Sequence, residues 1–207
     1  MKELLETVES LKKTDVGKTI DARIKEFKKM GGESNDGLFK ELCFCILTAN
    51  YNAEKSIKIQ DGIGECFLTD SETELAKKLK DFGHRYPNMR ARYISESRKC
   101  KDSLEEIVQF HDKQALRDWI VNNVKGLGYK EASHFLRNVG FDDYAIIDFH
   151  IIDILAKYDL IERPKSLTRK KYLEIENILK EMAKKIDLNL AELDLYLWYL
   201  ETGKILK

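Results

Sequence analysis

Residues 121–150 read VNNVKGLGYKEASHFLRNVGFDDYAIIDFH. The apolar spacing predicts one helix that ends at Val124, a turn over residues 125–128, and a second helix that begins near Tyr129. Two glycines that flank one apolar residue allow a tight turn with positive φ and a close approach to a ligand. The amides at the start of the second helix then form an anion site suited to a DNA phosphate. We interpret residues 121–139 as a helix-hairpin-helix; an ordinary helical corner with a glycine cap is the alternative.

Two side chains in this stretch have the types and positions expected of catalytic groups. Lys130 lies two residues after the second glycine, in the first turn of the new helix. The positive helix end and partial burial both disfavour an ammonium ion, so we expect a neutral, nucleophilic amine there. Asp148 lies between an apolar, strand-like run and a helix over residues 151–157, where its carboxylate is well placed to cap that helix. A purely structural cap is the alternative, although a cap also fixes the direction of the carboxylate.

The rest of the chain indicates an all-α fold. The 207 residues include only two prolines and eleven glycines, too few for the many turns of an all-β protein. Helical spacing of apolar residues continues almost throughout and predicts about ten helices. The most apolar of them runs from Leu38 to Leu47, and Ser71 with Glu74 has the form of a capping box before another. No apolar run is long enough to span a membrane.

Charge and cysteine content limit the classes of partner and compartment. Lysine plus arginine and aspartate plus glutamate each total 36, so the chain as a whole is not strongly basic. Residues 77–101 nevertheless carry nine basic and two acidic side chains, either a solvated helix face or a surface that follows DNA phosphates. The four cysteines form no C-x-x-C motif and predict free thiols in a reducing compartment. His84, His111 and His134 fit no metal or triad pattern, and we expect no metal site.

The hairpin and the downstream aspartate resemble those of a known family, the helix-hairpin-helix DNA glycosylases. Gly126-Leu-Gly128-Tyr-Lys130 matches the family's hairpin with its nucleophilic lysine, and Ile147-Asp148-Phe-His150 matches its Val-Asp-x-His-like segment. The separation of eighteen residues between lysine and aspartate is also the family's. Most members have proline where this chain has Lys125, which departs from the pattern but leaves both glycines and the lysine intact.

Within that family the chain is most similar to the compact archaeal-type 8-oxoguanine DNA glycosylase/AP lyases. The similarity lies in residues 130–140, in the short tail over 203–207 and in the absence of an extra N-terminal β domain, and it extends from about Phe39 to the last residue. Endonuclease III-type members hold an iron–sulfur cluster on four C-terminal cysteines. The last cysteine here is Cys100, so no such cluster is expected.

The resemblance implies a set of site residues. Lys130 would be the nucleophile and Asp148 the carboxylate that stabilises the transition state. Trp198 is expected to stack on the extruded base, with core packing as its alternative, and Asp194 to bind a guanine edge, with an exposed helix acid as its alternative. The implied DNA contacts are Lys125, Gly126, Gly128 and Asn50, the last filling the hole left by the extruded base, and the implied base pocket comprises Trp198, Asp194, Lys207 and Tyr86.

The resemblance also implies an architecture and a function. We expect two helical lobes, one from residues 1–35 and 155–207 and one from residues 36–154. The expected activity is excision of 8-oxoguanine from double-stranded DNA through a lysine Schiff base and β-elimination, by a cytoplasmic, nucleoid-associated monomer that needs no cofactor. Three alternatives stay open: a glycosylase for another oxidised base, a non-catalytic DNA-binding protein, and a helical protein-interaction module.

Overall fold

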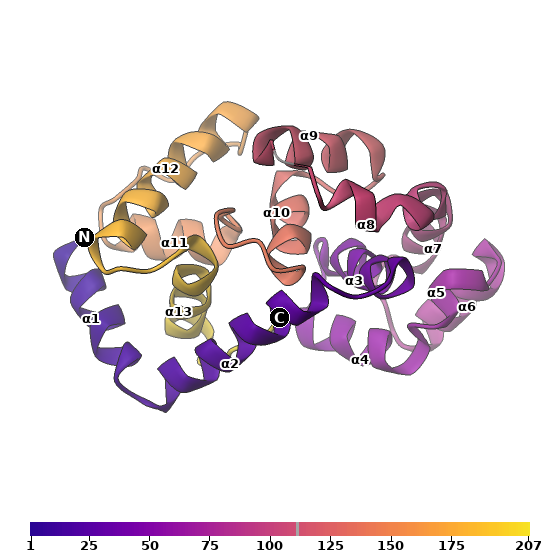
Figure 1. Cartoon of the computed structure of the whole chain (residues 1–207), viewed down its shortest axis with the longest axis horizontal. Coiled ribbons are helices and arrows are strands. Elements are labelled where there is room, and N and C mark those ends of the chain that lie inside the picture. Colours follow the sequence, from indigo (N-terminus) through magenta and orange to yellow (C-terminus); the bar gives the residue numbers. More distant parts are fainter. Residues whose placement is uncertain (111) are drawn as a thin grey trace. The chain divides into compact units, whose positions relative to one another are not determined.

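The computed structural model describes residues 1–110 and 112–207, so His111 lies outside the described residues. The predicted all-α class is confirmed, because no strand occurs in the part of the chain that is described (Figure 1). No helix in those ranges is both long and apolar enough to cross a membrane. The helices are α1 Lys2–Lys12, α2 Asp15–Met30, α3 Asn35–Thr48, α4 Ala53–Ile63, α5 Cys66–Thr69, α6 Glu72–Asp81, α7 Pro87–Ser97, the 3₁₀ helix η1 Arg98–Ser103, α8 Leu104–Ile107, α9 Lys113–Asn123, α10 Tyr129–Asn138, α11 Phe149–Lys157, α12 Arg169–Lys185 and α13 Leu190–Thr202.

The chain divides into two units, and both chain ends belong to the same one. Unit 1 comprises Met1–Lys28 and Gly140–Lys207, and unit 2 comprises Lys29–Val139. The boundaries therefore differ from the expected 35/36 and 154/155. The second boundary lies at Gly140, which has a φ of +97°. A Cβ on this glycine would lie 3.1 Å from Lys28 Cα, so the chain turns here against the end of α2 and residues 140–154 belong to unit 1.

Unit 2 is built around α3, the strongly apolar helix. Of the residues from Leu38 to Thr48, all are buried except Lys40, because α4, α7 and α10 all pack against this helix. A helix that is apolar on every side is typical of such a central position. The buried Glu41 carboxylate accepts hydrogen bonds from Asn138 Nδ2 at 2.6 Å and Gln60 Nε2 at 3.3 Å. These bonds fix the register of α3 against α10 and α4.

Unit 1 is held together by α11, α12 and α13. The capping box of α13 is complete, since Asn189 Oδ1 accepts from Glu192 N at 2.9 Å and Glu192 Oε2 from Asn189 N at 2.9 Å. The apolar stripe of α12, including Tyr172, Ile175 and Leu179, is buried as its spacing predicts. This unit therefore supplies a rigid frame for the segment that carries Asp148.

Candidate functional site

The hairpin glycines have different conformations. Gly126 has a φ of +89°, in the region that favours glycine. A Cβ there would come within 2.7 Å of Tyr93 Cε2, and closer still to Cδ2, so close packing also requires a glycine. Gly128 has a φ of −94°, and its Cβ would meet only Glu131 Oε2 at 3.4 Å. Of the two hairpin glycines, Gly126 therefore supplies the predicted positive φ and Gly128 does not.

The amide expected to bind phosphate at the start of α10 is occupied by a carboxylate of the same helix. Gly128 N donates to Glu131 Oε2 at 3.2 Å, as in a capping box. Glu131 thus supplies the negative oxygen that the exposed amides of a helix N-terminus favour. A DNA phosphate that binds this amide has to displace the Glu131 side chain.

Lys130 is the second residue of α10, in the first turn as predicted. Its side chain is 23% exposed, and its Nζ lies 4.0 Å from Glu131 Oε1. The preceding residue is held firmly, because the Tyr129 hydroxyl bonds the Asp118 carboxylate and the Arg117 guanidinium carbon lies 5.0 Å from the Tyr129 ring centroid. Helix α10 therefore presents the amine at a defined place with access to solvent.

Helix α7 supports both the hairpin and the Asn50 turn. Tyr93 lies against Gly126, and Lys125 Nζ lies 3.3 Å from Glu96 Oε2. Arg90, which is only 5% exposed, donates to the Ala49 carbonyl at the end of α3. Asn50 follows with a φ of +55° and an exposed side chain. Within unit 2, one helix thus anchors the two segments that are predicted to contact DNA.

Tyr86 is the N-cap residue of α7 and is half-buried. The guanidinium carbons of Arg85 and Arg90 lie 5.1 Å and 5.7 Å from its ring centroid. The Tyr86 ring therefore lies in a positively charged part of unit 2. Tyr86 belongs to unit 2, whereas the other residues of the expected base pocket belong to unit 1.

Asp148 caps α11, as predicted. Its Oδ1 accepts from Ile151 N at 3.0 Å, and the helix begins at Phe149, two residues earlier than expected. The preceding run is not a strand: Ile147 N donates to Tyr172 Oη at 3.1 Å, and Tyr172 Oη donates to Ala145 O at 2.6 Å. No local pattern marks Tyr172 for this role, which holds the backbone that leads into Asp148.

An aromatic cluster lies immediately beyond Asp148. The His150 ring lies 3.9 Å from that of Phe149 and 4.7 Å from that of Trp198, measured between centroids. Phe149 is 64% exposed, which is unusual for so large an apolar side chain. The Trp198 Nε1 is buried and has no hydrogen-bond partner among the described residues. The structure thus places Trp198 of α13 against His150 of α11, two residues after Asp148 in unit 1.

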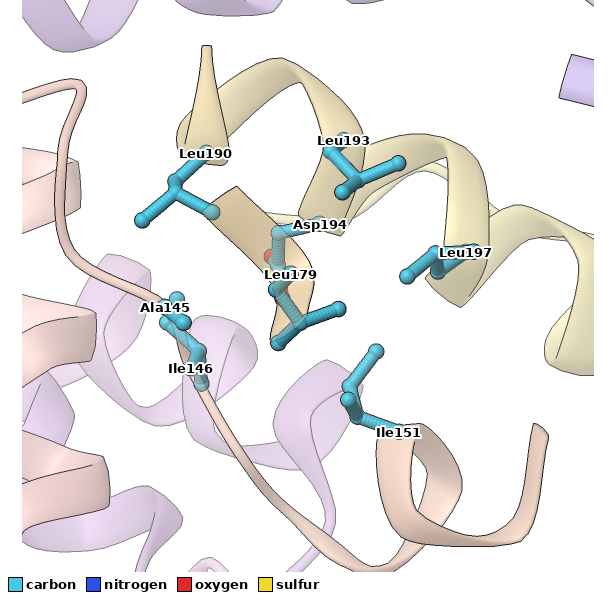
Figure 2. A pocket seen from close by; sticks show the side chains of 8 residues that line it. All are labelled: Ala145, Ile146, Ile151, Leu179, Leu190, Leu193, Asp194 and Leu197. Atoms are coloured by element: carbon cyan, nitrogen blue, oxygen red, sulfur yellow. The ribbon is translucent and has the colours of Figure 1, made fainter. Parts of the chain in front are cut away.

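Asp194 lies at a small apolar cavity (Figure 2). It is half-buried, so its reading as a freely exposed helix acid is wrong. The cavity holds about 10 Å³, room for one water molecule at most and far too little for a purine. Lys207 is half-buried at the end of the tail that follows α13. The base-pocket roles of Asp194 and Lys207 stay predictions. The cavity is lined by Ala145, Ile146, Ile151, Leu179, Leu190, Leu193, Asp194 and Leu197.

Comparisons of sequence and of structure with known proteins all match 8-oxoguanine DNA glycosylases. A family model described as 8-oxoguanine DNA glycosylase matches residues 20–188. The 8-oxoguanine DNA glycosylase/AP lyase of Korarchaeum cryptofilum is 52% identical over 207 residues, which is 99% of this chain and 98% of that protein. The Thermotoga maritima protein of the same name is 43% identical, with 99% of both chains covered. The crystal structure of the Methanocaldococcus jannaschii 8-oxoguanine glycosylase/lyase in complex with a 15mer DNA containing 8-oxoguanine has a TM-score of 0.96 and 51% identity, covering 99% of this chain and all of that one.

Proposed function

Because the chain belongs to the 8-oxoguanine DNA glycosylase family, we propose that it excises 8-oxoguanine from double-stranded DNA and cleaves the strand at the resulting abasic site. The observation that carries this proposal is the near-complete coverage of relatives that bear both activities in their names. The hairpin supports it independently, since Gly126 and the first turn of α10 place an accessible lysine beside helix-terminal amides.

In the proposed mechanism the lesion is first extruded from the duplex, because its glycosidic bond cannot be reached inside the stack. The Lys130 amine then attacks the sugar C1′, and the bond from C1′ to the base breaks, releasing 8-oxoguanine with a proton. The covalent product is a Schiff base between Lys130 and the opened sugar. This cation acidifies the C2′ proton, and β-elimination breaks the bond to the 3′ phosphate. No step of this sequence requires a metal or an organic cofactor.

Asp148 has the role of an electrostatic stabiliser in this mechanism. The transition state for loss of the base resembles an oxocarbenium ion, which a fixed carboxylate stabilises. The hydrogen bond from Ile151 N holds one carboxylate oxygen of Asp148 and thereby fixes the direction of the other. A pre-oriented charge acts more strongly than a mobile one because it does not reorganise during the reaction.

Binding would combine phosphate contacts with base stacking. The hairpin residues Lys125, Gly126 and Gly128 would receive a phosphate, Asn50 would fill the vacated position in the stack, and the aromatic side chains would hold the extruded base. Trp198 is the favoured stacking residue because its indole ring offers a large aromatic surface and contacts His150, two residues after Asp148. A DNA substrate and four free cysteines favour a cytoplasmic location, and we infer a monomer.

Borohydride trapping tests the proposal. Wild-type protein incubated with an 8-oxoguanine duplex and borohydride should form a stable covalent adduct, because borohydride reduces the Schiff base. Lys130→Gln should form none while it still binds the duplex. Cleavage of the 8-oxoguanine strand by Lys130→Gln would refute the assignment of the nucleophile.

Cleavage of other duplexes and the salt dependence of DNA binding distinguish the three alternative functions. A panel of duplexes that carry oxidised pyrimidines or an abasic site reports which lesion is excised. A non-catalytic DNA-binding protein would leave every duplex intact, including the abasic one. A protein-interaction module would lack the steep loss of DNA affinity with added salt that phosphate contacts cause.

A further inference from the structure

The end of α3 is fastened to a neighbouring turn by one buried histidine. His84 is 4% exposed, and its Nε2 lies 3.1 Å from the carbonyl oxygen of Leu47. Its Nδ1 accepts a hydrogen bond from the backbone N–H of Tyr86 at 3.0 Å. Both ring nitrogens are therefore engaged, one with a carbonyl three residues before Asn50 and the other with the amide of Tyr86.

The two partners fix the tautomer of this ring. The Leu47 carbonyl can only accept a hydrogen bond, so Nε2 must carry a proton. The Tyr86 amide can only donate, so Nδ1 must be unprotonated. Only the neutral ring with its proton on Nε2 satisfies both bonds. Burial, and the positive charge of Arg90, lower the pKa of His84 below its ordinary value and favour this neutral form.

The two hydrogen bonds of His84, to Leu47 and from Tyr86, form what we call the His84 bridge, and Tyr51 and Arg90 make further contacts around it. The Tyr51 ring lies 4.1 Å from the His84 ring, and the Tyr51 hydroxyl donates to Gly83 O at 2.9 Å. Arg90 donates to the Ala49 carbonyl, so α3 ends on carbonyls that side chains of a single neighbouring segment satisfy. Tyr51 and Arg90 are the titratable groups that face His84 from the turn after α3 and from α7.

We propose that His84 is a positioning residue that holds the Asn50 turn ready for insertion into a DNA duplex and fixes its place relative to Tyr86. The proposal rests on the proposed function, in which Asn50 fills the gap left by the extruded base. Asn50 follows Leu47 by one turn of chain, and Tyr86 is itself the amide donor to the ring. Because both backbone segments bond the same rigid ring, neither can move without breaking a buried hydrogen bond.

The physical reason for such a device is preorganisation. A side chain that enters a base stack has to offset the cost of unstacking, and any freedom that its loop loses on binding adds to that cost. Asn50 already has a left-handed backbone, with a φ of +55°, which persists only where neighbouring contacts maintain it. The His84 bridge supplies those contacts before DNA binds.

Two conservative variants separate the two bonds. His84→Gln keeps an amide N–H that reaches the Leu47 carbonyl but loses the acceptor for Tyr86 N. His84→Asn keeps an oxygen at the position of Nδ1 but loses the donor to Leu47. His84→Leu removes both bonds. Ile59→Val, a buried change in α4 that removes one methyl group, is the matched control for general loss of stability.

The first measurement does not depend on catalysis. Each protein is saturated with a duplex that contains a tetrahydrofuran abasic analogue and 2-aminopurine in the opposite strand, whose fluorescence rises when a side chain unstacks it. We expect wild type and Ile59→Val to give the full rise in fluorescence, His84→Gln and His84→Asn a partial rise, and His84→Leu almost none. An equal rise in all five proteins would overturn the proposal.

The second measurement compares two reactions at a temperature where circular dichroism shows every variant folded. Excision from an 8-oxoguanine pair requires extrusion of a base, whereas cleavage of a preformed abasic site does not. The His84 variants should excise about tenfold more slowly and cleave the abasic duplex at nearly the wild-type rate. Equal losses in both reactions would overturn the proposal, whereas a wild-type protein that excises nothing would refute the proposed function instead.

Discussion

Replacing Gly126 by alanine should be the most damaging single-methyl change in the hairpin. The φ of +89° places an alanine in the left-handed region, which costs about 1–2 kcal/mol. The added Cβ would also lie within 2.7 Å of Tyr93 Cε2, and relief of such overpacking costs about 1–3 kcal/mol. Reduced freedom of the unfolded chain returns about 0.4–1 kcal/mol. The free energy of unfolding should therefore fall by about 1–5 kcal/mol.

Two other glycines of unit 2 separate these contributions. Gly83 has a φ of +76° but nothing within 4 Å of an added Cβ, so Gly83→Ala reports the backbone strain alone. Gly128→Ala carries neither penalty, because φ is −94° and the nearest atom is 3.4 Å away. The expected order of destabilisation is Gly126→Ala, then Gly83→Ala, then Gly128→Ala near zero or slightly stabilising.

Urea denaturation at constant pH measures the three changes, with the midpoint and the slope reported separately. A double-mutant cycle isolates the steric part: in a Tyr93→Ala background the cost of Gly126→Ala should approach that of Gly83→Ala, an interaction of about 1–3 kcal/mol. If Gly126→Ala and Gly83→Ala destabilise the protein equally, or if the cycle gives no interaction energy, then Tyr93 does not pack tightly against Gly126.

Three further perturbations test individual contacts. Glu131→Gln keeps the acceptor for Gly128 N and removes the charge, so it should tighten DNA binding about two- to fivefold in fluorescence titrations, and weaker binding would contradict the reading of Glu131 as an anion in the phosphate position. His84 has its pKa lowered from 6.5, so the neutral form stabilises the fold above that pH. This stability should be lost as the pH falls through the lowered pKa, and unfolding free energies at pH 7, 6 and 5 should fall more steeply for wild type than for His84→Gln. Asn50→Gly should keep the stability within about 0.5 kcal/mol while slowing excision, whereas Asn50→Ala should add about 1 kcal/mol of backbone strain; equal stabilities would show that the left-handed turn is not maintained.

The parts of the fold that follow from neighbouring residues could be predicted from the sequence. The apolar spacing of α3, the turn before α10, the Asp148 cap and the Ser71–Glu74 capping box all depend on groups within four positions of one another. The hydrogen bond from Gly128 N to the Glu131 carboxylate obeys the same rule, since Glu131 lies three residues further on. A glycine N-cap has no side-chain oxygen, so the usual pattern of Ser or Thr did not reveal it.

Contacts between distant segments could not be predicted in this way. The His84 bridge joins residues separated by 37 positions, and the Tyr172 hydroxyl reaches Ala145 across 27. In the sequence His84 belongs to no motif, and Tyr172 is one apolar position in a helical stripe. Their roles arise from tertiary packing, which brings a donor or an acceptor to a backbone group that no local partner satisfies. The turn of the chain at Gly140 likewise depends on a residue far away in the sequence, Lys28.

The basic segment over residues 77–101 shows how charge counting misleads. Its positive charge suggested either a solvated face or a surface for phosphates, but several of its cations serve the fold of unit 2. Arg90 is buried on the Ala49 carbonyl, Arg98 Nε donates to Phe67 O at 2.8 Å, and Lys101 Nζ lies 2.8 Å from Asp36 Oδ1. A guanidinium that satisfies backbone carbonyls at the end of a short helix replaces a cap, at the cost of desolvating a charge. The net charge of the segment therefore overstates the positive charge that is available to bind DNA phosphates. What it contributes to the proposed site is Tyr86 and the helix α7, which holds the hairpin through Tyr93 and the Asn50 turn through Arg90.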